Sequence, residues 1–510
     1  MADGDDDDDG EGEAALIEDE APEDSASSRS QCTVCHRSMP VTRLGLIRVH
    51  GPVLNRCPGS RRPPAPVNTC QRGNIPDIAD PVQAFKLRRF SVKILKRVPR
   101  ASRDLSARKL AEILDRVSSD GSESSWDRLF CFPARCLRVP DRGGHRRSLA
   151  SHTNQLIKEE ADPTIVQSAP NRRTGKLIRD PADTLAGRVS AKLEEGDFKG
   201  AVRLASSEDS IAVPSSETLA TLREKHPLPH PDSAIPLVST EDHPMPVQVS
   251  EDEVARAICS FPCGSAGGPD ALRPQHLKDM ISKSALGGGQ MLLRSVTFFV
   301  NCVLRGETAV PAWASFFGAT LIALNKKGGG LRPIAVGCTL RCLVAKCAGA
   351  CVKEAMAALL APHQLGFGVP LGAEAAVHAS RIFLNNLQPG HLILKLDFRN
   401  AFNCLRRDKM IAAVKQLAPE LLPLVTCAYS TPSFLFFGED IIPSSEGVQQ
   451  GDPLGPLLFC LAVHDLVQQL QSEFNVFFLD DGTLGGSLEG VLEDFSTVER
   501  IAGELGLQLN

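Results

Sequence analysis

Hydrophobic and polar positions follow two different periods along the second half of the chain. Short apolar runs of the strand type, such as residues 391–396 and 474–478, are separated by longer stretches in which apolar residues recur every three or four positions. One helical face after residue 487 comprises Leu488, Val491, Leu492, Phe495, Val498 and Ile501. This alternation predicts an α+β or α/β fold from about residue 250 to residue 510.

The first 249 residues divide by pattern into four segments. Residues 1–31 combine an Asp run with Ser and Glu, and we expect them to form a disordered acidic tail. Residues 32–57 hold a cluster of Cys and His. Residues 58–180 begin with a Pro- and Arg-rich connector and continue as a basic region with helical spacing. Residues 181–249 carry helical patterns, notably 183–195, broken by Pro-rich stretches, and predict an N-terminal extension of the following domain.

The net charge of −5 conceals a strong partition along the chain. Residues 25–180 carry 30 basic against 13 acidic residues, whereas residues 1–24 carry 13 acidic residues and no Lys or Arg. A basic block of this size suits a polyanionic partner, because Lys and Arg that neutralise phosphates release counterions. A solvated basic face is the alternative interpretation.

The cellular setting is also constrained by composition. The start of the chain lacks the basic and apolar regions of a secretory signal, and no stretch reaches the length of a membrane span, so we expect a soluble, intracellular protein without membrane contact. The 16 cysteines are scattered, many within apolar runs, which favours reduced core residues over a disulfide framework.

Two acidic groups follow predicted strands. Asp397 ends the strand-like run HLILKL, and a carboxylate at a strand end points into a cleft. The sequence FNVFFLDDGTLGG (474–486) predicts a strand, a tight turn holding Asp480, Asp481 and Gly482, and a second strand. Between them, residues 445–470 predict a Gly-rich loop that runs into one helix with Pro456 in its first turn. We therefore expect the carboxylates to be presented from neighbouring strand ends above a flexible loop.

At these residues the chain resembles the reverse transcriptase domain of non-LTR retrotransposons. LKLDFRNAF is similar to the first palm motif of that family, EGVQQGDPLGP to the second, and FLDDG to a variant of its Tyr-Ala-Asp-Asp box. Upstream, SAGGPDALRPQHLKD (265–279) and LIALNKKGGGLRPIAVG (321–337) resemble the preceding fingers motifs. The resemblance covers about residues 250–510 and implies the fingers and palm of a right-hand polymerase, an α+β fold.

The resemblance implies a two-metal mechanism. A 3′-hydroxyl that attacks an α-phosphate needs two divalent ions, and Mg²⁺ prefers carboxylate and carbonyl oxygens. Asp397 and Asp480 would bridge the two ions, and the backbone carbonyl of Phe398 would add a ligand. Asp481 would contribute to the local field and geometry. The implied substrates are an RNA template, a DNA primer or target DNA, and deoxynucleoside triphosphates.

The resemblance also implies substrate-binding residues. Lys326, Lys327 and Arg332 would grip the incoming triphosphate, although a basic hairpin tip is the alternative. Gln450 and Gly451 would lie against the template or the nucleotide sugar, where Gly permits close approach. Phe402 would exclude a ribose 2′-hydroxyl, whereas an ordinary core Phe is the alternative.

The chain departs from the family pattern in two places. Gly455 stands where the family usually has Ser, which affects a side-chain hydrogen bond but not the backbone turn. After the helix at 487–505 the sequence reaches Gly-Leu-Gln-Leu-Asn and ends, without the Lys, primer grip and thumb that follow in the family. A truncated element or a partial gene model is the expectation from this comparison.

The Cys and His cluster predicts a zinc finger. Cys32, Cys35, His50 and Cys57 have the order of a Cys-Cys-His-Cys zinc site, and His36 and Cys70 could substitute as ligands. The string Cys-Thr-Val-Cys-His also matches a c-type haem attachment site, but that needs an oxidising compartment. One structural Zn²⁺ is the expectation, and incidental cysteines are the alternative. In site-specific non-LTR elements a finger of this kind helps bind target DNA. From this resemblance we expect the protein to function in the nucleus.

Two function classes remain open at this point. The first is an RNA-directed DNA polymerase of a non-LTR retroelement. The second is a catalytically inactive, truncated remnant that binds nucleic acid through its zinc finger and basic block. The three Asp residues favour the first, and the absent thumb motifs favour the second; Phe402 and the fingers motifs argue against a viral RNA-dependent RNA polymerase.

Overall fold

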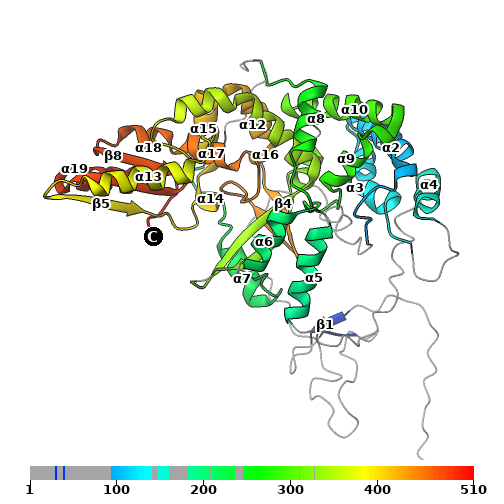
Figure 1. The fold of residues 1–510 in the computed structure, drawn as a ribbon, viewed down its shortest axis with the longest axis horizontal. Coiled ribbons are helices and arrows are strands. Elements are labelled where there is room, and N and C mark those ends of the chain that lie inside the picture. Colours follow the sequence, from blue (N-terminus) through cyan, green and yellow to red (C-terminus); the bar gives the residue numbers. More distant parts are fainter. Residues whose placement is uncertain are drawn as a thin grey trace, which may run out of the picture. The chain divides into compact units, whose positions relative to one another are not determined.

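A computed structural model gives the fold of the chain (Figure 1). It describes residues 29–31, 38–40, 93–140, 148–159, 181–194, 196–206, 210–233, 235, 245–308, 310–326 and 328–510. The chain divides into two compact units, residues 1–77 and 78–510. In the first unit, β1 (Arg29–Gln31) pairs antiparallel with β2 (Ser38–Pro40). The elements described below all belong to the second unit.

No helix within the described segments is both long enough and apolar enough to cross a membrane.

A helical layer is built around α2 (Arg103–Asp120) and α10 (Leu286–Leu304). Leu110 and Leu114 of α2 are fully buried, as their helical spacing predicts. Trp126 packs edge-on against Phe299 and Phe316, with ring centroids 5.9 Å and 5.3 Å away. The other elements of this layer are η1 (Arg100–Ser102), α3 (Glu123–Cys136), α4 (Leu149–Glu159), α8 (Glu251–Cys259), α9 (Pro274–Met280), η4 (Lys283–Ala285) and α11 (Val310–Phe316).

A four-stranded sheet follows in the order β4-β3-β6-β7. Its strands are β3 (Ala319–Asn325), β4 (Leu331–Gly337), β6 (Ser433–Phe437) and β7 (Asp440–Ser444). The β3–β4 and β6–β7 pairs are antiparallel, and β3 and β6 are parallel. Helix α7 (Ser216–Glu224) joins the core of this sheet through Leu222, which is fully buried. The helices α5 (Pro181–Glu194) and α6 (Phe198–Ser206) precede it.

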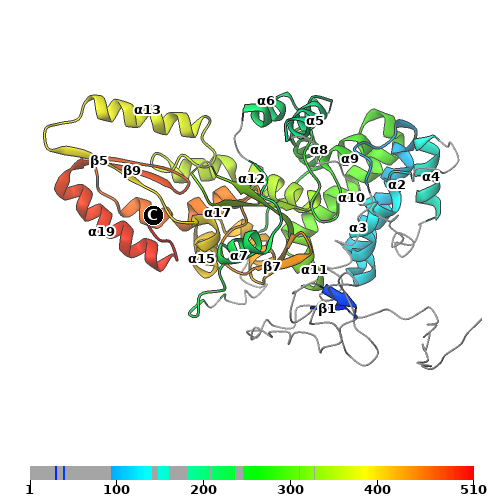
Figure 2. The ribbon, with the colours of Figure 1, turned by 90° about the horizontal axis from the view of Figure 1, so that it is seen from below.

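A second, three-stranded antiparallel sheet has the order β5-β9-β8. Its strands are β5 (His391–Leu396), β8 (Phe474–Phe478) and β9 (Asp481–Ser487). Helices α13 (Gly372–Asn385) and α19 (Leu488–Glu504) lie on opposite sides of it (Figure 2). The Phe383 ring of α13 stacks on Phe474 with centroids 5.0 Å apart.

The main apolar core joins the helical layer to the three-stranded sheet, whereas the apolar residues of the four-stranded sheet form two smaller clusters of their own. In α17, three consecutive residues of the main core, Leu457, Leu458 and Phe459, are fully buried. The helices that contribute to this core are α12 (Thr339–Leu360), α14 (Ala401–Cys404), α15 (Arg407–Leu417), η5 (Pro419–Leu421), α16 (Leu422–Tyr429), α17 (Gly455–Ala462) and α18 (His464–Gln469). The mixture of helix and sheet confirms the α+β class.

Two local expectations were wrong. Asp481 and Gly482 are not turn residues but the first residues of β9, because their backbones pair with Phe478 and Phe477. The helix expected through residue 470 is two helices, since the backbone leaves the helical region at Val463. On α19, Val491, Val498 and Ile501 of the predicted apolar face are buried, whereas Leu488 and Leu492 are 53% and 54% exposed.

Candidate active site

Asp397 follows β5 directly, as its position after an apolar run predicts. Its side chain is exposed, whereas the flanking Leu396 and Phe398 are buried. The backbone of Phe398 forms a β-bridge with Leu509, and the Asn510 N–H donates to the Asp397 carbonyl at 2.9 Å. The Asn510 side chain also donates to Asp397 Oδ2 at 2.8 Å. The carboxylate is therefore held by a segment more than a hundred residues away.

Asp480 lies in the short turn between β8 and β9. The preceding Leu479 has a φ of 58°, a left-handed conformation that is costly for a side chain of this kind. The buried Gln364 compensates for this cost: its amide oxygen accepts from the Leu479 N–H at 2.9 Å, and its nitrogen donates to the Leu479 carbonyl at 3.1 Å. Gln364 thus fixes the conformation of the turn that presents Asp480.

The three Asp residues converge at one end of the three-stranded sheet. Leu396 pairs with Gly482 at the end of the β5–β9 pairing, so that the adjoining residues Asp397 and Asp481 lie at the same end of the sheet. Burial raises the pKa of the half-buried Asp480 carboxyl, and the charges of Asp481 and Asp397 raise it further, whereas Arg332 lowers it. Lys395 Nζ lies 3.8 Å from Asp481 Oδ1. The site therefore holds a surplus of negative charge.

The chemistry of these donors fits a divalent cation. Carboxylate and carbonyl oxygens are the ligands that Mg²⁺ prefers, and a cation would offset the repulsion that raises the Asp480 pKa. Within the described residues, no three His, Cys, Asp or Glu side chains are already close enough to form a metal site. Asp397, Phe398 and Asp480 thus lie near one another, but their oxygen atoms do not already form a complete set of metal ligands.

The hairpin of β3 and β4 carries Lys326 and Arg332. The Lys326 N–H donates to the Gly330 carbonyl at 3.0 Å and closes the turn, in which Gly329 and Gly330 adopt positive φ angles of 89° and 82°. Arg332 is close enough to Asp480 to lower its pKa, so the hairpin faces the acidic site. Lys327 lies outside the described residues.

Gln450 and Gly451 lie against β4. The Ala335 N–H donates to the Gln450 carbonyl at 2.7 Å. At Gly451, φ is 132° and a Cβ atom would come 2.1 Å from the Ala335 carbonyl oxygen. No other residue fits here without a backbone shift, which gives a physical reason for the Gly in the QQG string.

A buried ion pair between Arg341 and Asp452 holds the same loop in place. Arg341 donates to Asp452 Oδ2 at 2.9 Å, and both side chains are 4% exposed. The Tyr429 hydroxyl donates to the same carboxylate, and Arg341 donates to the Gln449 side chain. A buried charge needs such partners, because an unpaired one would be costly. Nothing in the local sequence around Arg341 indicates this role, since its partner lies 111 positions away.

Phe402 stacks on Phe459, with ring centroids 4.8 Å apart and planes tilted by 16°. It is half-buried and packs against the main core, and its carbonyl accepts from the Val448 N–H at 2.6 Å. The ring is thus held rigidly by core residues on the chain segment that begins at Asp397.

The predicted zinc ligands Cys32, Cys35, His50 and Cys57 lie outside the described residues, as do the substitutes His36 and Cys70.

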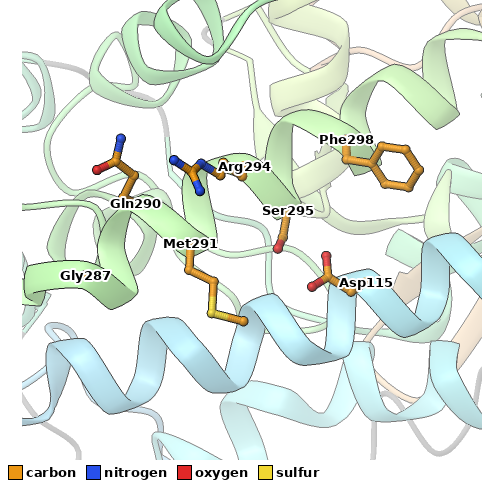
Figure 3. Close-up of a pocket in the computed structure, with 7 residues that line it drawn as sticks. All are labelled: Asp115, Gly287, Gln290, Met291, Arg294, Ser295 and Phe298. Carbon is orange, nitrogen blue, oxygen red and sulfur yellow. The ribbon is translucent and has the colours of Figure 1, made fainter.

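A separate shallow hollow of about 460 Å³ lies between α2 and α10 (Figure 3). Its lining combines the apolar Met291 and Phe298 with the polar Asp115 and Arg294. None of its lining residues belongs to the predicted site, and Figure 3 shows no convergence of its charged groups on a single point.

Comparison with known proteins finds similarity in the C-terminal part of the chain. Residues 324–510 match the family model of reverse transcriptase (RNA-dependent DNA polymerase). The matched segment contains Asp397, Asp480 and Asp481. The chain is also 26% identical over 260 residues to the retrotransposable element SLACS 132 kDa protein of Trypanosoma brucei gambiense. That match covers 49% of this chain and 21% of the relative, so the chain spans about a fifth of the relative's length. Both matches support the reverse transcriptase of a retroelement.

Proposed function

We propose that this chain is an RNA-directed DNA polymerase of a non-LTR retroelement, which extends a DNA 3′-hydroxyl on an RNA template. The observation that carries the proposal is the convergence of Asp397, Asp480 and Asp481 at one sheet end, inside the segment that matches reverse transcriptases. The β3–β4 hairpin supports it, because it places Arg332 near the same acidic group.

Asp397 and Asp480, with the Phe398 carbonyl, would hold two Mg²⁺ ions. Bound there, the ions would activate the attacking hydroxyl and stabilise the charge on the leaving pyrophosphate. Asp481 would adjust the field at this site, where Lys395 Nζ lies 3.8 Å from its carboxylate.

The remaining predicted residues would bind and select the nucleotide. Lys326, Lys327 and Arg332 are cations suited to phosphate oxygens. Gln450 and Gly451, fixed against β4, would form the floor under the nucleotide or template. Phe402, immobilised on Phe459, would exclude a 2′-hydroxyl. In this proposal the four residues Cys32, Cys35, His50 and Cys57 hold one structural Zn²⁺ and, with the basic block, contact target DNA in the nucleus.

A primer-extension assay tests the proposal. The full chain is incubated with an RNA template, an annealed DNA primer, deoxynucleoside triphosphates and Mg²⁺. Template-dependent extension that chelator abolishes is the expected result. Binding of the primer–template without any extension would contradict it and would favour the inactive nucleic-acid-binding remnant.

A further inference from the structure

A cavity of about 510 Å³ is lined in part by Arg399 and Asn400, which follow Asp397 in the sequence. Three segments that are distant in sequence line it. They are the chain after α7, with Lys225 and Leu228, the tip of the β3–β4 hairpin, with Gly330 and Leu331, and the turn after Asp397, with Arg399 and Asn400. The cavity is therefore lined by Arg399, two residues after Asp397 in the sequence, and by the tip of the hairpin that carries Lys326.

The backbone of Lys225 is fixed at this cavity by a hydrogen bond. The Asn400 side chain donates to the Lys225 carbonyl at 2.9 Å, which fastens the extension to the segment after Asp397. The preceding helix is anchored by Leu222, which is fully buried against the four-stranded sheet. The Lys225 side chain is half-buried, so its ammonium group has a restricted set of positions.

Lys225 and Arg399 line the cavity, and Lys326 lies close enough to Lys225 for their charges to interact. Burial lowers the pKa of Lys225, and the nearby charges of Lys326 and Arg399 lower it further against the opposing effect of Glu224. None of these three cations has an ion-pair partner in the described part of the chain.

Two acids, Glu224 and Glu446, and a further cation, Arg406, also line the cavity. Glu446 accepts from the N–H groups of Arg407 and His230 at 2.7 Å and 2.9 Å, and Arg406 pairs with Asp408 at 2.7 Å. A cavity lined by two unpaired cations, Lys225 and Arg399, with Lys326 nearby, suits an anionic ligand.

We propose that Lys225 and Arg399 bind the polyphosphate tail of the incoming nucleoside triphosphate, alongside Lys326. This inference rests on the proposed polymerase function and adds to it a binding residue from the N-terminal extension. A nucleic-acid backbone is a less suitable occupant, because its phosphates are spaced along a path, whereas these cations converge on one cavity.

Equilibrium binding of inorganic tripolyphosphate to the full chain tests the proposal without requiring catalysis. We expect Lys225→Ala to weaken binding roughly tenfold or more, because a charge-assisted contact to phosphate is lost. Lys225→Arg should retain most of the affinity. Lys415→Ala, which removes an exposed Lys on α15, is the matched control and should bind as the unmodified chain does.

Three outcomes would overturn the proposal. Equal tripolyphosphate affinity in the Lys225→Ala and Lys415→Ala variants would remove Lys225 from the site. Unchanged tripolyphosphate affinity with weaker binding of a single-stranded RNA would assign Lys225 to the nucleic acid instead. In primer extension, Lys225→Ala should raise the KM for the nucleotide and leave the KM for primer–template unchanged, and the reverse pattern would contradict the proposal. If no variant extends a primer, the polymerase function fails, but tripolyphosphate binding still decides the role of Lys225.

Discussion

At the scale of single residues, the geometry around the acidic site depends on side chains that carry no charge. Gln364 spans both backbone groups of Leu479 and also accepts from the Gly366 N–H at 2.9 Å. Asn510 holds one oxygen of Asp397. These amides restrain the turn and the carboxylate, so that the acids stay close in spite of their mutual repulsion.

Replacing Gln364 tests this restraint. Gln364→Leu leaves the Leu479 and Gly366 N–H groups without their acceptor, at a cost of about 1–3 kcal/mol for each buried group. We expect a lower thermal unfolding midpoint and a kcat for primer extension reduced by about tenfold or more, because the position of Asp480 is no longer fixed. Gln388→Leu, at an exposed position between α13 and β5, is the control. An unaltered kcat in a Gln364→Leu variant of normal stability would refute the role.

Phe402 provides a second prediction at this scale. Phe402→Val should increase the incorporation of ribonucleotides relative to deoxyribonucleotides, because the smaller side chain leaves room for a 2′-hydroxyl. The measurement is the ratio of the two incorporation efficiencies. Phe298→Val, on the exposed side of α10, is the matched control. An unchanged ratio in an active Phe402→Val variant would make Phe402 a core residue only.

At the scale of elements, the strands and helices near the site follow from local patterns. The apolar run before Asp397 forms β5, and the pattern after residue 487 forms α19. The limits of local reasoning appear where partners are distant. The Arg341–Asp452 ion pair and the contact of Gln364 with Leu479 join residues 111 and 115 positions apart, so their approach is set by the tertiary fold.

The contact between the QQG loop and β4 can be tested at this scale. Gly451→Ala should displace the loop and lower extension activity by about tenfold or more, because the new Cβ overlaps the Ala335 carbonyl and the φ of 132° is strained for Ala. Gly328→Ala is the matched control, since nothing lies within 4 Å of its Cβ position. Equal activities of the two variants would show that the loop does not need this close approach.

At the scale of the whole molecule, the Lys and Arg residues of the basic block (residues 25–180) have two roles. Some stabilise the fold, and the others are available to nucleic acid. Arg97 and Arg103 belong to the first group, because both donate to the buried Asp279, at 2.7 Å and 3.0 Å. Helix α2, which begins at Arg103, packs against α10 within the same unit as the segment that matches reverse transcriptases. The positive charge of residues 25–180 is therefore only partly available to nucleic acid.

The zinc prediction belongs to this scale as well. The full chain should contain one Zn²⁺ per molecule, and Cys35→Ser should lose it, because removal of one thiolate opens a tetrahedral site. Cys259→Ser, at an exposed Cys on α8, and Cys70→Ser should both retain the metal. Metal content is measured by elemental analysis after dialysis. A zinc-free chain, or loss of zinc in Cys70→Ser instead, would contradict the ligand set.

The central claim is that Asp397 and Asp480 together carry the polymerase chemistry, and one measurement tests it most directly. RNA-templated primer extension is compared between Asp397→Asn, Asp480→Asn and the control Asp465→Asn, which changes an exposed acid on α18. Each of the first two should retain less than about 1% of the activity while binding primer–template almost unchanged, because the lost charge affects the metal and not the basic residues. Asp465→Asn should remain active. Extension above a few per cent of normal by either Asp397→Asn or Asp480→Asn would contradict the account.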